Sequence, residues 1–133
     1  METLEIKLLY LENDRRQLEL MSGRFVKRGL SVITAPDIEK ARKLIEKNVP
    51  SFFLFDLALG AELNGFEFAK DICLSKRVAY ERFFFLTAFD DKFNIPSQFC
   101  REHVFSKPIR SPQIDQLARL IFEQFAKMNR AKK

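Results

Sequence analysis

The segment FFLFDLALGAELNG, residues 52–65, places one carboxylate, Asp56, directly after four apolar residues. An ionised carboxylate beside such an apolar run is unfavourable unless a charged partner or a reaction compensates it. A carboxylate can attack phosphorus and hold the phosphoryl group as an acyl phosphate. Because that attack brings two anions together, it needs cationic groups around the reacting oxygen atoms. Asp56 is therefore a candidate phosphoryl acceptor.

Other apolar runs also lead into polar residues. Glu12 and Asn13 follow IKLLYL, Thr87 stands near the end of RFFFLTA, and Lys107 ends HVFSK. Acidic and amide oxygens suit Mg²⁺, whereas a hydroxyl and an ammonium suit the oxygens of a phosphate. If the runs are parallel strands of one sheet, these side chains meet beyond its carboxyl ends, where ligands bind in such sheets.

The elements that must position these residues are alternating strands and amphipathic helices. Strands are expected at 6–11, 30–35, 51–57, 82–88 and 103–107, and helices at 14–28, 37–48, 65–74 and 112–125. Ser111 is expected to be the N-cap of the last helix and Pro112 its first residue. Residues 90–99 favour at most a short helix, because Pro96 interrupts them. This order predicts an α/β fold, (βα)5, with a doubly wound five-stranded parallel sheet of flavodoxin-like or CheY-like type.

The bulk composition indicates one soluble domain. The chain has 133 residues and a net charge of +5, of which the last seven residues contribute four basic side chains. We therefore interpret 1–126 as the domain and 127–133 as a basic C-terminal tail or the start of a linker, not as a nucleic-acid patch. No signal peptide or membrane-spanning run is recognisable. Cys73 and Cys100 lack metal-site or CxxC spacing, which favours free thiols in a reducing cytoplasm.

Taken in order, the motifs resemble the response-regulator receiver domain of bacterial two-component signalling. The matching segments are LLYLENDRRQLELM, FFLFDLALGAELNGFEFAKDI, FFFLTAF and VFSKPI, over residues 5–125. Each motif is weak alone. Their order and spacing together are specific for this family. There are 44 residues from Glu12 to Asp56, 31 from Asp56 to Thr87 and 20 from Thr87 to Lys107.

The resemblance implies a role for each motif. Asp56 would accept a phosphoryl group from a histidine kinase or phosphotransfer protein. Glu12, Asn13, Asp56 and the backbone carbonyl of Ala58 would hold Mg²⁺, while Thr87 and Lys107 would contact the phosphoryl group. The peptide bond after Lys107 is often cis in this family. Such a domain is not a conventional enzyme: it catalyses only its own phosphorylation and dephosphorylation, and signals to a docked protein or a fused output domain, in some cases as a homodimer.

The sequence departs from the family pattern at several positions. The residue after Glu12 is usually Asp but here is Asn13, which predicts weaker Mg²⁺ binding; Asp14 is expected to cap the following helix. The loop after Asp56 is one residue longer than usual, with Gly60 where the family often has proline. Three residues before the lysine, Val104 replaces the usual switch aromatic, with Phe105 next to it.

Three other functions compete with that of a phosphorylated receiver. A receiver-like interaction module without switching is favoured by Asn13 and Val104. A phosphatase of the haloacid dehalogenase type would need a second Asp two residues after the first, where Ala58 stands. A flavin-binding flavodoxin would need a phosphate-binding loop after the first strand. His103, the one histidine, is expected to be a solvated residue at the edge of a strand.

Overall fold

Five parallel strands form the centre of this computed structural model, which describes residues 5–58, 64–88 and 95–131. The order along the chain is β1 (Lys7–Leu11), α1 (Arg15–Lys27), β2 (Ser31–Ala35), α2 (Ile38–Lys47), β3 (Phe52–Asp56), α3 (Gly65–Lys76), η1 (Tyr80–Arg82), β4 (Phe83–Thr87), η3 (Arg101–His103), β5 (Val104–Ser106) and α4 (Ser111–Ala131). The strands lie in the order β2-β1-β3-β4-β5. The predicted parallel α/β fold of CheY-like type is confirmed.

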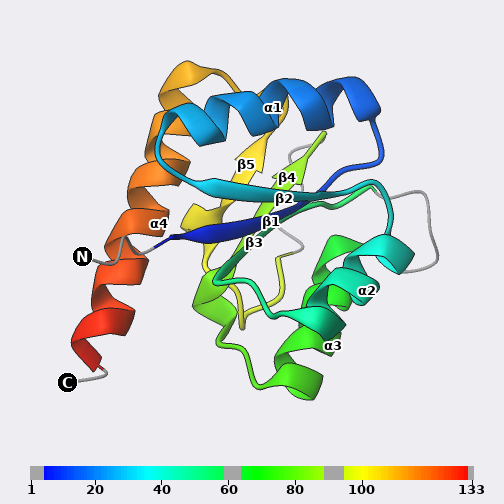
Figure 1. Cartoon of the computed structure of the whole chain (residues 1–133), viewed down its shortest axis with the longest axis vertical. Helices are drawn as coiled ribbons and strands as arrows, with labels where there is room; N and C mark the ends of the chain where they lie inside the picture. The colour runs from blue at the N-terminus through cyan, green and yellow to red at the C-terminus, as the bar shows by residue number, and fades with distance from the viewer. Residues whose placement is uncertain (1–4, 59–63, 89–94, 132–133) are drawn as a thin grey trace.

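The helices cover the sheet on both faces, with α1 and α4 on one side and α2 and α3 on the other (Figure 1). Because strand side chains alternate between faces, each strand supplies both layers. Leu8, Phe52 and Phe84 pack under α1 and α4, and their neighbours Leu9, Phe53 and Phe83 pack under α2 and α3. This double cover explains why the strands are apolar on both faces.

Side-chain caps fix where the first three helices begin, next to the strand ends that matter for the site. The Asp14 carboxylate accepts hydrogen bonds from the backbone N–H groups of Arg16 and Gln17, as predicted. Asp37 and Asn64 cap α2 and α3 in the same way. These caps satisfy N–H groups that a helix leaves without an internal partner.

The last helix begins one residue earlier than predicted. Ser111 is its first residue, not its N-cap, because the carbonyl of Arg110 already accepts the hydrogen bond of the Ile114 N–H. The side chain of Gln113 accepts a hydrogen bond from the Arg110 N–H, which is half of a capping box. The helix continues through residue 131, into the segment interpreted as a basic tail.

The connection from β4 to β5 was predicted to form at most a short helix at residues 90–99. Residues 90–94 of that segment lie outside the described residues. Residues 95–100 form a turn, closed by the Phe99 N–H on the Pro96 carbonyl at 3.0 Å. The ring of Phe99 is buried and contacts four other rings, those of Phe66, Tyr80, Phe83 and Phe85. Phe99 therefore anchors this turn to the core formed by α3, η1 and β4.

Among the described helices, none has the length and apolar character needed to cross a bilayer. Both cysteines are free, Cys73 buried and Cys100 partly so.

Candidate functional site

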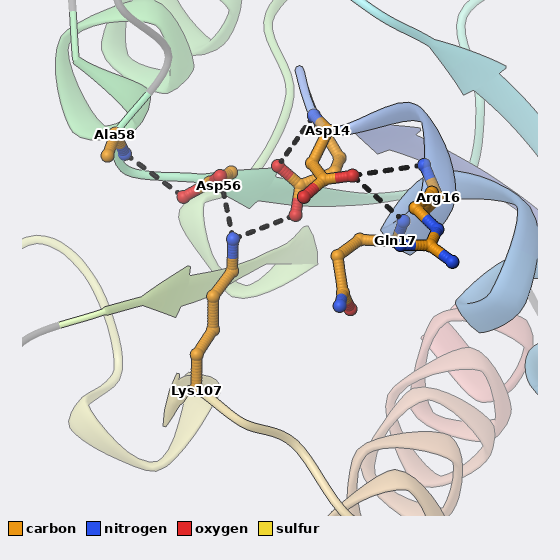
Figure 2. Close-up of polar contacts among 7 residues, drawn as sticks. Asp14, Arg16, Gln17, Asp56, Ala58 and Lys107 are labelled. Atoms are coloured by element: carbon orange, nitrogen blue, oxygen red, sulfur yellow. Dashed lines mark hydrogen bonds and ion pairs between the residues drawn. The ribbon is translucent and has the colours of Figure 1, made fainter.

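The ammonium of Lys107 joins two carboxylates at the carboxyl ends of the strands. Its Nζ lies 2.8 Å from Oδ2 of Asp56 and 2.8 Å from Oε1 of Glu12. Figure 2 shows the lysine side chain reaching up from the end of β5 toward Asp56 at the end of β3. Both carboxylates are buried, so the ammonium supplies the charged partner that the sequence demanded for Asp56.

Backbone hydrogen bonds between adjacent strand ends hold these residues in place. The N–H of Lys107 donates to the carbonyl of Thr87 at 2.7 Å, and the N–H of Glu12 donates to the carbonyl of Ala35 at 3.1 Å. Asp56 is the last residue of β3 and pairs with Leu86 in β4. The site is therefore built on the sheet and not on a loop.

The start of α3 approaches the acceptor residue very closely. A Cβ at Gly65 would lie 2.9 Å from the backbone oxygen of Asp56 and 3.0 Å from the side chain of Leu57. Glycine is needed there because the chain turns back against the end of β3. The Asp56 Oδ1 accepts a hydrogen bond from the N–H of Ala58 at 3.0 Å (Figure 2). This bond fixes the orientation of the carboxylate.

The electrostatics of the pocket follow from burial and from these contacts. Burial of the Glu12 carboxyl, reinforced by the adjacent Asp56 carboxylate, raises its pKa to about 7, although Lys107 opposes the change. Burial acts to lower the pKa of Lys107, but the two carboxylates outweigh it and the pKa is raised. The ammonium therefore stays charged, as a group facing a phosphate must.

The residues predicted around Asp56 do come to one edge of the sheet. Thr87 is buried at the end of β4, next to the Lys107 backbone, and Asn13 is exposed directly after Glu12. The peptide bond between Lys107 and Pro108 is cis, as the resemblance implied.

The donor set around Asp56 is compatible with Mg²⁺. Glu12 and Asp56 supply two carboxylates, and Mg²⁺ commonly uses one or two carboxylates and keeps waters. Asn13 follows Glu12, and its side chain is exposed. Within the described ranges, no group of three or more His, Cys, Asp or Glu side chains is arranged to hold a metal ion.

His103 contradicts its prediction as a solvated strand-edge residue. It belongs to η3, is buried, and stacks on Phe84 with ring centroids 4.0 Å apart. Its Nδ1 lies 3.0 Å from the carbonyl oxygen of Phe83. The ring is part of the core because it stacks on β4, and burial lowers the pKa of the imidazole.

Tyr10 is a polar group near the site that the sequence reading did not single out. Its ring is fully buried and packs edge-on against Phe25, and its hydroxyl has no hydrogen-bond partner among the described residues. Burial raises the pKa of the phenol, and the carboxylates of Glu12 and Asp56 add to the effect. The sequence signal for this contact is the spacing: Tyr10 stands two residues before Glu12, and side chains two residues apart in a strand lie on the same face.

Two further positions depart from the receiver pattern, Gly60 and Val104. Gly60 lies outside the described residues. Val104 and Phe105 are both buried in β5 but on opposite faces of the sheet, Val104 toward α2 and α3 and Phe105 toward α1 and α4. The small Val104 side chain belongs to the same core cluster as Phe99.

Comparisons with known proteins support the fold. No protein-family model matches the chain, and no curated protein matches it significantly. A receiver domain of a Francisella response regulator is 20% identical, with a TM-score of 0.76 over 93% of this chain and 99% of that one. A response regulator receiver domain from Clostridium thermocellum is 14% identical, with a TM-score of 0.75 over 94% and 99%. The N-terminal domain of a response regulator/sensory box/GGDEF protein from Carboxydothermus hydrogenoformans is 19% identical, with a TM-score of 0.73 over 91% and 97%. The chain thus has the fold of receiver domains.

Proposed function

We propose that this chain is a response-regulator receiver domain that accepts a phosphoryl group on Asp56 from a histidine kinase or a phosphotransfer protein. The observation that carries the proposal is the Lys107 ammonium held 2.8 Å from the carboxylates of both Asp56 and Glu12. A buried acceptor and a fixed cation are groups that phosphoryl transfer to a carboxylate uses, and Thr87, buried at the end of the adjacent strand β4, would contact the phosphoryl group.

In the proposed reaction, a carboxylate oxygen of Asp56 attacks the phosphorus of a phosphohistidine. An O–P bond forms, the N–P bond breaks, and its electron pair stays on the imidazole nitrogen. Lys107 compensates the negative charge that gathers as the two anions approach. The Ala58 N–H keeps the carboxylate oriented. Mg²⁺, held by Glu12, Asn13, Asp56 and the Ala58 carbonyl, would supply further positive charge.

The proposed domain turns over no outside substrate and signals by docking onto a partner in the cytoplasm or through a fused output domain. Incubation of the protein with a small phosphodonor and Mg²⁺ tests the acceptor. Intact-protein mass spectrometry should detect the addition of one phosphoryl group, which Asp56→Ala abolishes. Asp71→Asn, which removes a half-exposed carboxylate on α3, is the matched control and should retain the addition. Equal labelling of Asp56→Ala and the unmodified chain would exclude Asp56 as the acceptor.

A receiver-like interaction module that does not switch is the second candidate. Asn13 in place of a third acidic residue and Val104 in place of an aromatic favour it. If the phosphodonor adds nothing to the unmodified chain while Asn13→Asp becomes labelled, the module is the better description.

A further inference from the structure

The four carboxylate oxygens of Glu12 and Asp56 all accept hydrogen bonds from other groups of this chain. The Nζ of Lys107 donates to Oε1 of Glu12 and to Oδ2 of Asp56, both at 2.8 Å. The backbone N–H of Ala58 donates to Oδ1 of Asp56 at 3.0 Å (Figure 2). The backbone N–H of Asp14 lies 3.4 Å from Oε2 of Glu12. A cation that binds these two carboxylates therefore meets oxygens that already have donors.

The Lys107 ammonium is the donor of this set that can move away. Ala58 and Asp14 donate through backbone N–H groups, next to the end of β3 and the start of α1. The ammonium stands at the end of a flexible four-carbon stem, and the lysine side chain is 24% exposed. The carboxylate side chains of Glu12 and Asp56 are 0% and 3% exposed. The lysine can therefore turn toward solvent while both carboxylates stay in place.

Charge decides whether the lysine and a divalent cation can hold these oxygens together. Mg²⁺ binds oxygen at about 2.0–2.1 Å, and the ammonium lies 2.8 Å from one oxygen of each carboxylate. Two cations that share one of these oxygens would lie less than about 5 Å apart. They would bring three positive charges to two negative ones in a buried site, where like charges repel strongly. Asn13, which follows Glu12, adds no negative charge.

We propose that Lys107 competes with Mg²⁺ for the carboxylates of Glu12 and Asp56, so that its ammonium must leave Glu12 before the divalent cation binds there. The inference concerns regulation of the acceptor site and rests on the proposed function for its consequence. The released ammonium becomes available to the oxygens of an arriving phosphoryl group, whose negative charge compensates both cations. Phosphorylation of Asp56 then depends on the Mg²⁺ concentration through the lysine as well as through the metal itself.

Isothermal titration calorimetry of the full chain with Mg²⁺ alone tests the competition. Lys107→Met removes the ammonium and keeps the length of the side chain. Lys107→Arg keeps a positive charge at the same position, and Lys47→Met removes an exposed lysine of α2, so these two variants are the controls. Because burial raises the pKa of Glu12 to about 7, the titrations are made at about pH 9, where the carboxylate is ionised. Circular dichroism checks that every variant folds.

Lys107→Met should bind Mg²⁺ at least about tenfold more tightly than the unmodified chain, because no charge-assisted hydrogen bond has to break first. Lys107→Arg and Lys47→Met should bind no more tightly than the unmodified chain. Equal affinity of Lys107→Met and the unmodified chain would overturn the proposal, and so would the absence of Mg²⁺ binding in both.

A second measurement follows the lysine itself in the unmodified chain. The ¹³Cε–¹Hε NMR signal of Lys107, assigned by its absence from Lys107→Arg, reports the surroundings of the ammonium. Saturation with Mg²⁺ should shift this signal toward the position of solvent-exposed lysines. A signal that stays in place when Mg²⁺ is bound would show that lysine and metal share the oxygens, and the competition would be refuted. Neither measurement uses phosphorylation, so a chain that a phosphodonor fails to label would refute the proposed function and leave the competition standing.

Discussion

The strand ends that hold Asp56 and the connection from β4 to β5 are built in different ways. At Asp56, three charged groups from three strands converge, and each is held by backbone contacts to a neighbouring strand. Between β4 and β5, described residues 95–100 contain a turn, and the Phe99 ring is buried in the core. Val104, at the start of β5, is small where receivers often carry an aromatic residue.

This contrast separates two requirements of a switch. In the proposed receiver, accepting a phosphoryl group depends on a few atoms at fixed distances. Passing the change to a partner depends on two alternative packings of a surface element. The charged groups around Asp56 are held by the sheet, whereas the described part of the β4–β5 connection packs around Phe99. The predictions below test whether the two regions are separable.

Replacing Phe99 should have the largest effect on stability. Phe99→Ala removes a buried ring that contacts four others, and such changes lower the free energy of unfolding by about 3–5 kcal/mol. Urea unfolding followed by circular dichroism measures it. Phe122→Ala, at a ring 41% exposed on α4, is the control and should cost much less. Equal losses would mean that Phe99 does not hold the β4–β5 connection in place.

Replacing Lys107 should slow phosphorylation by a small phosphodonor. Lys107→Met keeps the length of the side chain but removes the charge between Asp56 and Glu12. Loss of one preorganised charge-stabilising donor slows a reaction by about 10²–10³-fold, and we expect that range for labelling by a small phosphodonor. Lys47→Met on the exposed face of α2 is the control. An unchanged labelling rate in Lys107→Met would remove the lysine from the proposed mechanism.

The contrast also explains which features the sequence could predict. Two signals in the sequence are local. Strands that are apolar on both faces predicted the parallel sheet, and Asp14 at the start of a helix predicted the N-cap; both predictions are confirmed. The meeting of Glu12, Asp56 and Lys107 followed from the rule that parallel strands end at one edge.

Other features depend on tertiary contacts that no local pattern encodes. His103 reads as polar and exposed, yet the stacking partner Phe84 and the Phe83 carbonyl, twenty residues away, bury it. Phe99 lies in a segment whose proline indicated only a weak helix, and its role depends on rings from α3, η1 and β4. The start of α4 was misplaced by one residue because the Gln113 side chain allows Arg110 to serve as the cap.

An acidic residue at position 13 should strengthen Mg²⁺ binding at the proposed acceptor site without altering the β4–β5 connection. Asn13→Asp adds one charge-assisted contact, worth about 1 kcal/mol or more, so Mg²⁺ should bind about fivefold or more tightly. Isothermal titration calorimetry measures the affinity. Asp14→Asn, which retains a capping side chain, is the control and should bind Mg²⁺ as the unmodified chain does. Equal affinity of Asn13→Asp and the unmodified chain would place residue 13 outside the metal site.

The pH dependence of stability should have opposite signs in the two regions. Burial lowers the pKa of His103 from 6.5, so the unfolded state binds more protons just below that pH. Its contribution is present above pH 6.5 and is lost as the pH falls through the folded-state pKa. Glu12 acts in the opposite sense, because its pKa is raised from 4.5 to about 7. Its contribution is present below pH 4.5 and is lost as the pH rises through about 7.

Urea unfolding between pH 5 and pH 8 separates the two groups. His103→Phe keeps the stacking on Phe84 but cannot titrate, so the remaining slope should follow Glu12 and stability should fall as the pH rises. Glu12→Gln should leave the His103 slope, and stability should rise with pH up to about 6.5. His103 directly precedes β5, so His103→Phe reports on the start of that strand. Glu12 pairs with Lys107, which directly follows β5, so Glu12→Gln reports on its end. If neither variant changes the slope of the free energy of unfolding against pH, other groups control the pH dependence, and the pKa values of His103 and Glu12 are not shifted by burial.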